Sequence, residues 1–115
     1  MKTAFAAALA LACLVSSAAA AEICEASQYG VGDGYHGRRT ASGARFNTFA
    51  RDPFTVAHKS RPLGSVVTIT NLSNGRAIRA VVNDRGPFVR GRCVDLGRAG
   101  AIALGMGDLA RVSVE

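Results

Sequence analysis

Two neighbouring segments in the middle of the chain have the residue pattern of paired β-strands. Residues 65–72 are rich in β-branched side chains, which favour strands. Residues 76–83 carry apolar side chains at every second position, so one face of this segment is apolar. The intervening Ser73-Asn74-Gly75 contains the Asn-Gly pair that favours hairpin turns. The pattern predicts a β-hairpin over residues 65–83.

The remaining segments with a regular pattern are short and separated by turn residues. Residues 23–29 alternate loosely and predict an opening strand, and residues 54–58 and 93–96 predict two brief strands. Residues 97–104 are rich in alanine and predict one short helix, and residues 109–114 predict a last strand.

A glycine-rich stretch separates the first two predicted strands. Residues 30–43 contain glycine at positions 30, 32, 34, 37 and 43 and show no periodicity, which predicts a long exposed loop. Loops of this length in a compact domain are usually either functional or disordered. The six strands and one helix predict an all-β fold, and closing such a small sheet into a barrel removes its exposed edges.

The first residues have the pattern of a secretory signal peptide. Lys2 supplies a positive start, residues 4–15 are almost wholly apolar, and residues 18–21 are four alanines. Cleavage between Ala21 and Glu22 satisfies the requirement for small residues. The alternative is a retained membrane anchor, but the apolar run is well short of the roughly 20 residues that span a bilayer. We expect a signal peptide over 1–21 and one exported domain over 22–115.

Cys13 offers a second processing route. It follows Leu11-Ala12, which resembles a lipoprotein signal, although Ala10 stands where leucine is usual. Lipid anchoring through Cys13 is therefore the alternative to simple cleavage. Both routes predict a secreted or periplasmic protein, and simple cleavage leaves no stable membrane insertion.

The exported domain is strongly basic. Removing Lys2 from the 14 Lys and Arg leaves 13 basic residues, against 8 acidic ones. Such a domain is attracted to anionic polymers, which outside the cytoplasm include the cell wall. A nucleic-acid partner is not expected, because aromatic residues are few and no basic helix is present. The size suits a monomer of one domain.

Two cysteines remain after cleavage, Cys24 and Cys93. An even number in an oxidising compartment favours a disulfide. The alternatives are two separate buried thiols, or a zinc site that also uses His36 and His58. No metal-binding spacing supports zinc, and we expect no metal and no cofactor.

Three carboxyl groups are candidates for chemistry. Asp95 lies in an apolar run, where burial raises a carboxyl pKa and suits a general acid, although Asp95 could instead cap the following helix. Asp84 ends a predicted strand just before Arg85 and could simply stabilise the turn. Glu25 lies within a predicted strand, where an exposed face would also explain it. His36, His58, Tyr29 and Tyr35 are candidates for sugar contacts.

Six blocks of the chain resemble the rare lipoprotein A (RlpA-like) family. They are Glu25–Gly30, His36–Gly43, Phe46-Asn47, Ala57–Gly64, Val67–Arg76 and Val82–Leu96. The resemblance implies a six-stranded double-psi β-barrel of the bacterial envelope. It also implies an endolytic lytic transglycosylase that cuts peptidoglycan glycan strands, preferably strands without stem peptides, to 1,6-anhydro ends.

The resemblance also suggests roles for individual residues. The catalytic set would be Asp95, Asp84 and Glu25, with Asp95 as the acid. The residues assigned to substrate binding are His36, Ser27, Tyr29, His58 and Arg85. Gln28 and Gly97 depart from the family pattern, which usually has an aromatic and a serine there. Cys24 and Cys93 are not general to the family. The alternative function is a non-catalytic, expansin-like module that binds peptidoglycan glycan.

Overall fold

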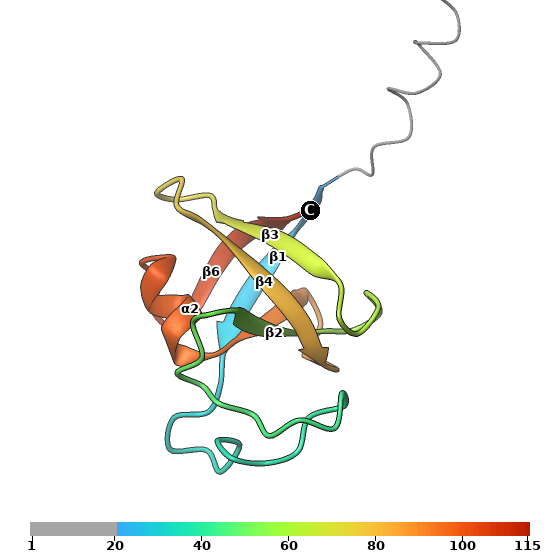
Figure 1. Ribbon diagram of the computed structural model, residues 1–115. Helices are drawn as coiled ribbons and strands as arrows, with labels where there is room; N and C mark the ends of the chain where they lie inside the picture. The colour runs from blue at the N-terminus through green and yellow to red at the C-terminus, as the bar shows by residue number, and fades with distance from the viewer. Residues whose placement is uncertain (1–20) are drawn as a thin grey trace, which may run out of the picture.

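The computed structural model describes residues 21–115 of the chain, and the predicted signal peptide and Cys13 lie outside this range except for Ala21. The described residues form six strands and one short helix (Figure 1). In chain order these are β1 (Glu22–Gln28), β2 (Phe54–His58), β3 (Val66–Asn71), β4 (Ala77–Asp84), β5 (Arg92–Leu96), α2 (Arg98–Ala103) and β6 (Leu109–Val114).

The six strands close into a barrel in the order β1-β5-β2-β4-β3-β6. Two of the pairings are parallel, β1 with β5 and β2 with β4, and the other four are antiparallel. Each parallel pair joins strands that are distant in the sequence, which is the double-psi arrangement expected from the resemblance. The all-β prediction is confirmed, and α2 lies against the side of the barrel (Figure 1).

The barrel interior is filled by aliphatic side chains from all six strands. Ile69, Val82, Val94, Leu96 and Val112 are fully buried there, because each lies on the inward face of its strand. Burying each such side chain stabilises the fold by about 1.5–3 kcal/mol. Among residues 21–115, no helix has the length and apolar character needed to cross a membrane.

The strand register aligns polar positions on the outside of the barrel. Ser27 of β1 lies opposite Asp95 of β5, and Asp95 lies opposite Ala57 of β2. Ala57 in turn lies opposite Asp84 of β4. Because Val94 and Leu96 point inward, Asp95 between them points outward. Four adjacent strands thus contribute one row of small and acidic side chains.

The loop between β1 and β2, residues 29–53, covers one end of the barrel (Figure 1). Thr48 fastens it: its hydroxyl donates a hydrogen bond to the Tyr29 carbonyl (2.8 Å) and accepts one from the Arg98 amide at the start of α2 (2.7 Å). A side chain at Gly97 would lie 2.8 Å from the Thr48 carbonyl oxygen, so only glycine allows this approach. Gly97 is the N-cap residue of α2, and the hydroxyl of Thr48, rather than the carboxyl of Asp95, accepts the first amide of the helix.

The β3–β4 hairpin is confirmed, but its turn differs in detail from the prediction. Gly75 adopts a positive φ of 77°, whereas Asn74 does not. The turn is held instead by Asn71, whose carbonyl accepts the Gly75 amide (2.8 Å) and whose side chain accepts the Ser73 amide (3.1 Å). The hydrogen bonds of Asn71, at the end of β3, therefore stabilise the turn that the Asn74-Gly75 pair was expected to form.

A disulfide joins Cys24 of β1 to Cys93 of β5, with 5.8 Å between their Cα atoms. The predicted bond is therefore present, and two free thiols do not describe this structure. The bond fastens the parallel pair that also carries Ser27 and Asp95.

Candidate active site

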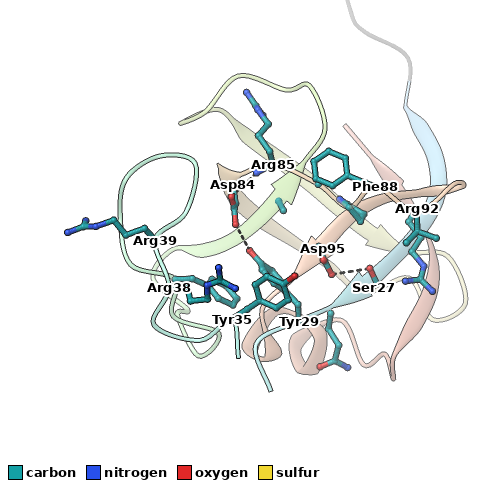
Figure 2. Close-up of a pocket in the computed structure, with 16 residues that line it drawn as sticks. Ser27, Tyr29, Tyr35, Arg38, Arg39, Asp84, Arg85, Phe88, Arg92 and Asp95 are labelled. Atoms are coloured by element: carbon teal, nitrogen blue, oxygen red, sulfur yellow. Dashed lines mark hydrogen bonds between the residues drawn. The ribbon is translucent and has the colours of Figure 1, made fainter. Parts of the chain in front are cut away.

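A groove of about 430 Å³ opens on the outer surface of the barrel, over the row of small and acidic side chains. Its floor contains Ser27, Ala57, Asp84 and Asp95. One wall comes from the long loop and the other from residues 85–89, between β4 and β5. Figure 2 shows Asp84 and Asp95 facing the same space, with arginines around them.

Asp95 lies half-buried in the floor. Its Oδ1 accepts a hydrogen bond from the Ser27 hydroxyl at 3.0 Å (Figure 2). Burial raises the pKa of the Asp95 carboxyl above its usual range, and the negative charges of Asp33 and Asp84 also raise it, while Ser27 and Arg92 act in the opposite direction. With one hydroxyl as its hydrogen-bond partner among the described side chains, Asp95 can take up and release a proton.

Asp84 has a different environment at the end of β4. Its Oδ1 accepts hydrogen bonds from the amides of Ala41 and Arg85, each at 2.9 Å, and its Oδ2 accepts one from the Tyr29 hydroxyl at 3.3 Å. The three hydrogen bonds fix the orientation of the Asp84 carboxylate, which accepts all of them. The two carboxyl groups of the floor are therefore suited to different work.

Tyr29 connects Asp84 to the loop wall. Its ring stacks on Phe46 with centroids 4.1 Å apart and meets the edge of Tyr35 at 5.7 Å. Burial and the charges of Asp84 and Asp95 raise the pKa of the Tyr29 hydroxyl well above its ordinary range. The hydroxyl therefore stays protonated at neutral pH and donates to Asp84.

Arginines surround the acidic floor. The Arg38 guanidinium lies 5.5 Å from the centre of the Tyr35 ring, a cation–π distance. Arg85 donates to the carbonyls of His58 (3.2 Å) and Arg61 (2.7 Å), and so supports the groove wall. Arg85 was predicted to bind substrate, and the structure places it in the groove lining.

Of the predicted catalytic residues, Glu25 lies outside the groove lining. Its Oε1 is 3.7 Å from Nε of Arg92, and Arg92 does line the groove. Glu25 therefore contacts a groove residue, Arg92, but does not lie in the floor with Asp84 and Asp95.

The two histidines also lie outside the groove lining, and each binds backbone. Nδ1 of His36 accepts a hydrogen bond from the Thr48 amide at 3.2 Å, which ties it to the loop anchor. Nδ1 of the buried His58 accepts the amides of Ser60 (3.1 Å) and Arg61 (3.0 Å), so its Nε2 carries the hydrogen toward Glu22, 3.0 Å away. Both imidazoles thus organise loops.

Reading the sequence missed several groove residues. Phe88 is 80% exposed at the rim, and Arg38, Arg92 and Phe46 also line the groove. The unusual feature of Phe88 is a large apolar side chain in a turn just after Gly86-Pro87, which is a signal that sequence reading could have used. The arginines gave no such signal, because twelve are spread along the chain.

The described residues contain one group of potential metal ligands, Glu22, Cys24 and Cys93, whose ligand atoms lie within 4.8 Å of one another. The two cysteines are joined in the disulfide, so they offer no thiolate. The alternative zinc site with His36 and His58 fails for the same reason.

The family model described as lytic transglycolase matches residues 22–115, the whole of the barrel. The chain belongs to this lytic transglycolase family. The resemblance to RlpA-like proteins is therefore confirmed.

Curated relatives of this lytic transglycolase domain carry the RlpA name. A probable endolytic peptidoglycan transglycosylase RlpA of Nostoc sp. is 53% identical over 81 residues, which are 70% of this chain and 21% of the relative. The endolytic peptidoglycan transglycosylase RlpA of Pasteurella multocida is 47% identical over 89 residues, 71% of this chain and 29% of the relative. The chain thus spans less than a third of these relatives' length.

Solved structures share the fold of the lytic transglycolase domain at low identity. An expansin of Clavibacter michiganensis matches with a TM-score of 0.63 and 20% identity, covering 84% of this chain and 50% of that one. A Streptomyces papain inhibitor matches with a TM-score of 0.61 and 18% identity, covering 86% of this chain and 96% of that one. At this identity the matches establish the barrel fold alone.

Proposed function

We propose that the protein is an endolytic lytic transglycosylase, which cuts peptidoglycan glycan strands, preferably those lacking stem peptides, and leaves 1,6-anhydro ends. The observation that carries the proposal is Asp95, a half-buried carboxyl with a raised pKa in the floor of an open groove. The names of the RlpA relatives support the same substrate and reaction. The site of action would be the bacterial envelope outside the cytoplasm, and the enzyme would work as a monomer.

The reaction needs one group that first gives and then takes a proton. Asp95 protonates the glycosidic oxygen while the bond to C1 breaks, and the bonding electrons remain on that oxygen. The C6 hydroxyl of the same sugar then attacks C1, and its proton passes to the Asp95 carboxylate. Atoms balance without water, so a second carboxylate is not needed to activate one.

The neighbours of Asp95 have supporting roles. Asp84, fixed by three donors, places a negative charge near the positively charged sugar of the transition state. Arg92 lowers the pKa of Asp95, and Glu25 lies beside Arg92, so we assign Glu25 the role of moderating that positive charge. His36 positions the loop wall through Thr48. Ser27 orients the acid, Tyr29 forms the wall, and His58 and Arg85 hold the opposite loop together.

The proposal is tested by Asp95→Asn, which keeps the shape of the side chain but removes the exchangeable proton. Wild-type protein incubated with peptide-free glycan should release anhydro-ended products detectable by mass spectrometry, and the variant should release none while still binding sacculi. Glu115→Gln removes an exposed carboxylate outside the groove lining and should cleave normally. Anhydro products from Asp95→Asn at the wild-type rate would sink the assignment.

A non-catalytic module that binds glycan is the second candidate. The observation in its favour is the structural similarity to a Clavibacter michiganensis expansin, a mutant of which is described in complex with cellohexaose (TM-score 0.60). The same incubation separates the two functions. Binding of sacculi by wild-type protein without any anhydro product would support the module and exclude the transglycosylase.

A further inference from the structure

A second hollow of about 290 Å³ adjoins the groove. Its lining residues are Gln28, Tyr29, Val31, Asp33, Arg98 and Asp108. Gln28 and Tyr29 also line the groove, so they form a common boundary between the two spaces. None of the residues assigned to catalysis lines the second hollow.

Strand register places this boundary beside the proposed acid. Gln28 follows Ser27 on β1, and Ser27 donates its hydrogen bond to Asp95. On β5, Asp95 and Leu96 lie opposite Ser27 and Gln28 respectively. Gln28 and Tyr29 line both spaces, so a polymer that lies over Asp95 reaches the second hollow by passing over these two residues.

The Gln28 side chain at this boundary is held in place by two hydrogen bonds. Nε2 of Gln28 donates to the Gly107 carbonyl at 2.8 Å, and Oε1 of Gln28 accepts from Nη1 of Arg98 at 3.3 Å. These bonds connect the Gln28 side chain to the loop just before β6 and to the first residue of α2. The amide of Gln28 is therefore fixed in orientation, and its bond to Nη1 holds the Arg98 side chain beside the boundary.

The lining of the second hollow suits a neutral hydroxylated ligand. Arg98 forms no ion pair within 4.0 Å in the part of the chain that the structure describes, so it is separated from Asp33 and Asp108. Both Asp33 oxygens are already bonded to backbone, to the amides of Gly30 (2.8 Å) and Tyr35 (3.1 Å). Arg98 and Asp108 can then contact hydroxyl or amide groups, while the exposed Val31 offers an apolar surface.

We propose that the second hollow is a distal sugar-binding subsite for the glycan strand whose bond is broken at Asp95, with Arg98 and Asp108 as its hydrogen-bonding groups. The identity of the strand rests on the proposed function. The subsite makes affinity depend on strand length, because a short oligosaccharide fills only the groove and a longer one fills both spaces. An enzyme that cuts within a strand gains from holding sugars beyond the cleaved bond.

The test uses protein carrying Asp95→Asn, so that oligosaccharides are bound without being cut. Affinity is measured by calorimetry for a peptide-free glycan tetrasaccharide and octasaccharide. The octasaccharide should bind more tightly, and adding Arg98→Ala should weaken its binding by about tenfold or more, as expected for the loss of one hydrogen bond to a charged group. Binding of the tetrasaccharide should be unchanged. Asp108→Asn should act in the same direction.

Arg111→Ala is the matched control, because Arg111 is an exposed arginine of β6 outside both linings. Equal affinity for the two lengths, or an equal loss with Arg111→Ala, would overturn the subsite. The proposed function is judged separately by anhydro products from the parent protein. Length-dependent binding without cleavage would keep the subsite and reject the reaction, and cleavage with length-independent binding would do the reverse.

Discussion

The Ser27 hydroxyl donates a hydrogen bond to the Asp95 carboxylate at 3.0 Å, between two parallel strands. This bond lowers the pKa of Asp95 and so works against the larger effect of burial. It also fixes which way the carboxyl group points. Ser27 is therefore the residue through which the proton affinity of the proposed acid can be tuned.

Ser27→Ala should move the alkaline limb of the pH profile of kcat/KM to higher pH. The substitution removes a bond that stabilises the ionised form, so the pKa of Asp95 rises and the acid stays protonated to higher pH. Activity at neutral pH should be retained, in contrast to Asp95→Asn. Ser65→Ala, whose hydroxyl donates to the Pro62 carbonyl outside the groove lining, is the control. A limb that moves to lower pH would contradict this role.

Asp95→Asn should stabilise the protein at neutral pH. The pKa of Asp95 is raised in the folded state, so the ionised form opposes folding at pH values above the folded pKa. The gain should shrink as the pH falls through that pKa and vanish below the unfolded value of 3.8. Urea unfolding of both proteins across this range measures it. A variant that is less stable than wild type at neutral pH would show that burial of Asp95 carries no such cost.

Thr48→Val should loosen the loop wall. The substitution keeps the shape of the side chain but leaves the partly buried Tyr29 carbonyl and Arg98 amide without their partner, which costs about 2 kcal/mol. Hydrogen exchange in residues 30–50 should become faster, and urea unfolding should report the loss of stability. Thr70→Val on β3 provides the comparison. Similar effects from both substitutions would show that Thr48 is not a special anchor.

Replacing Cys24 and Cys93 together with alanine should lower the free energy of unfolding by about 4 kcal/mol. The bond spans 69 residues and restricts the unfolded chain accordingly. Urea unfolding of the double variant measures the change, and wild-type protein under reducing conditions should behave alike. An unchanged midpoint in both would mean that the disulfide is not needed for stability.

Much of the fold could be predicted because individual strands have a recognisable local pattern of apolar and polar residues. The β4 prediction over 76–83 differs by one residue from the observed Ala77–Asp84, and β2 and β6 match the predicted ranges. Strand alternation also separated the buried face of β4 from the outer one. The pairing of the strands could not be predicted from the local sequence pattern, since the parallel contact of β1 with β5 forms only in the closed barrel.

The site was harder to predict, because its residues meet only through strand register. Asp84 and Asp95 are both opposite Ala57, a neighbourhood that the linear sequence does not display. The roles of His36 and His58 depend on backbone amides of other residues, which a residue type cannot reveal. The sequence therefore indicated the candidate acids better than the residues that support them.

The pairing of β1 also sets the order in which the protein can fold. Both neighbours of this first strand, β5 and β6, are the last two strands to be synthesised. While the ribosome is still producing the middle of the chain, β1 has no partner, and its pairing waits for long-range loop closure. Residues 22–28 therefore stay unpaired until β5 and β6 have been synthesised, so closure of the barrel is among the last steps in folding of this domain.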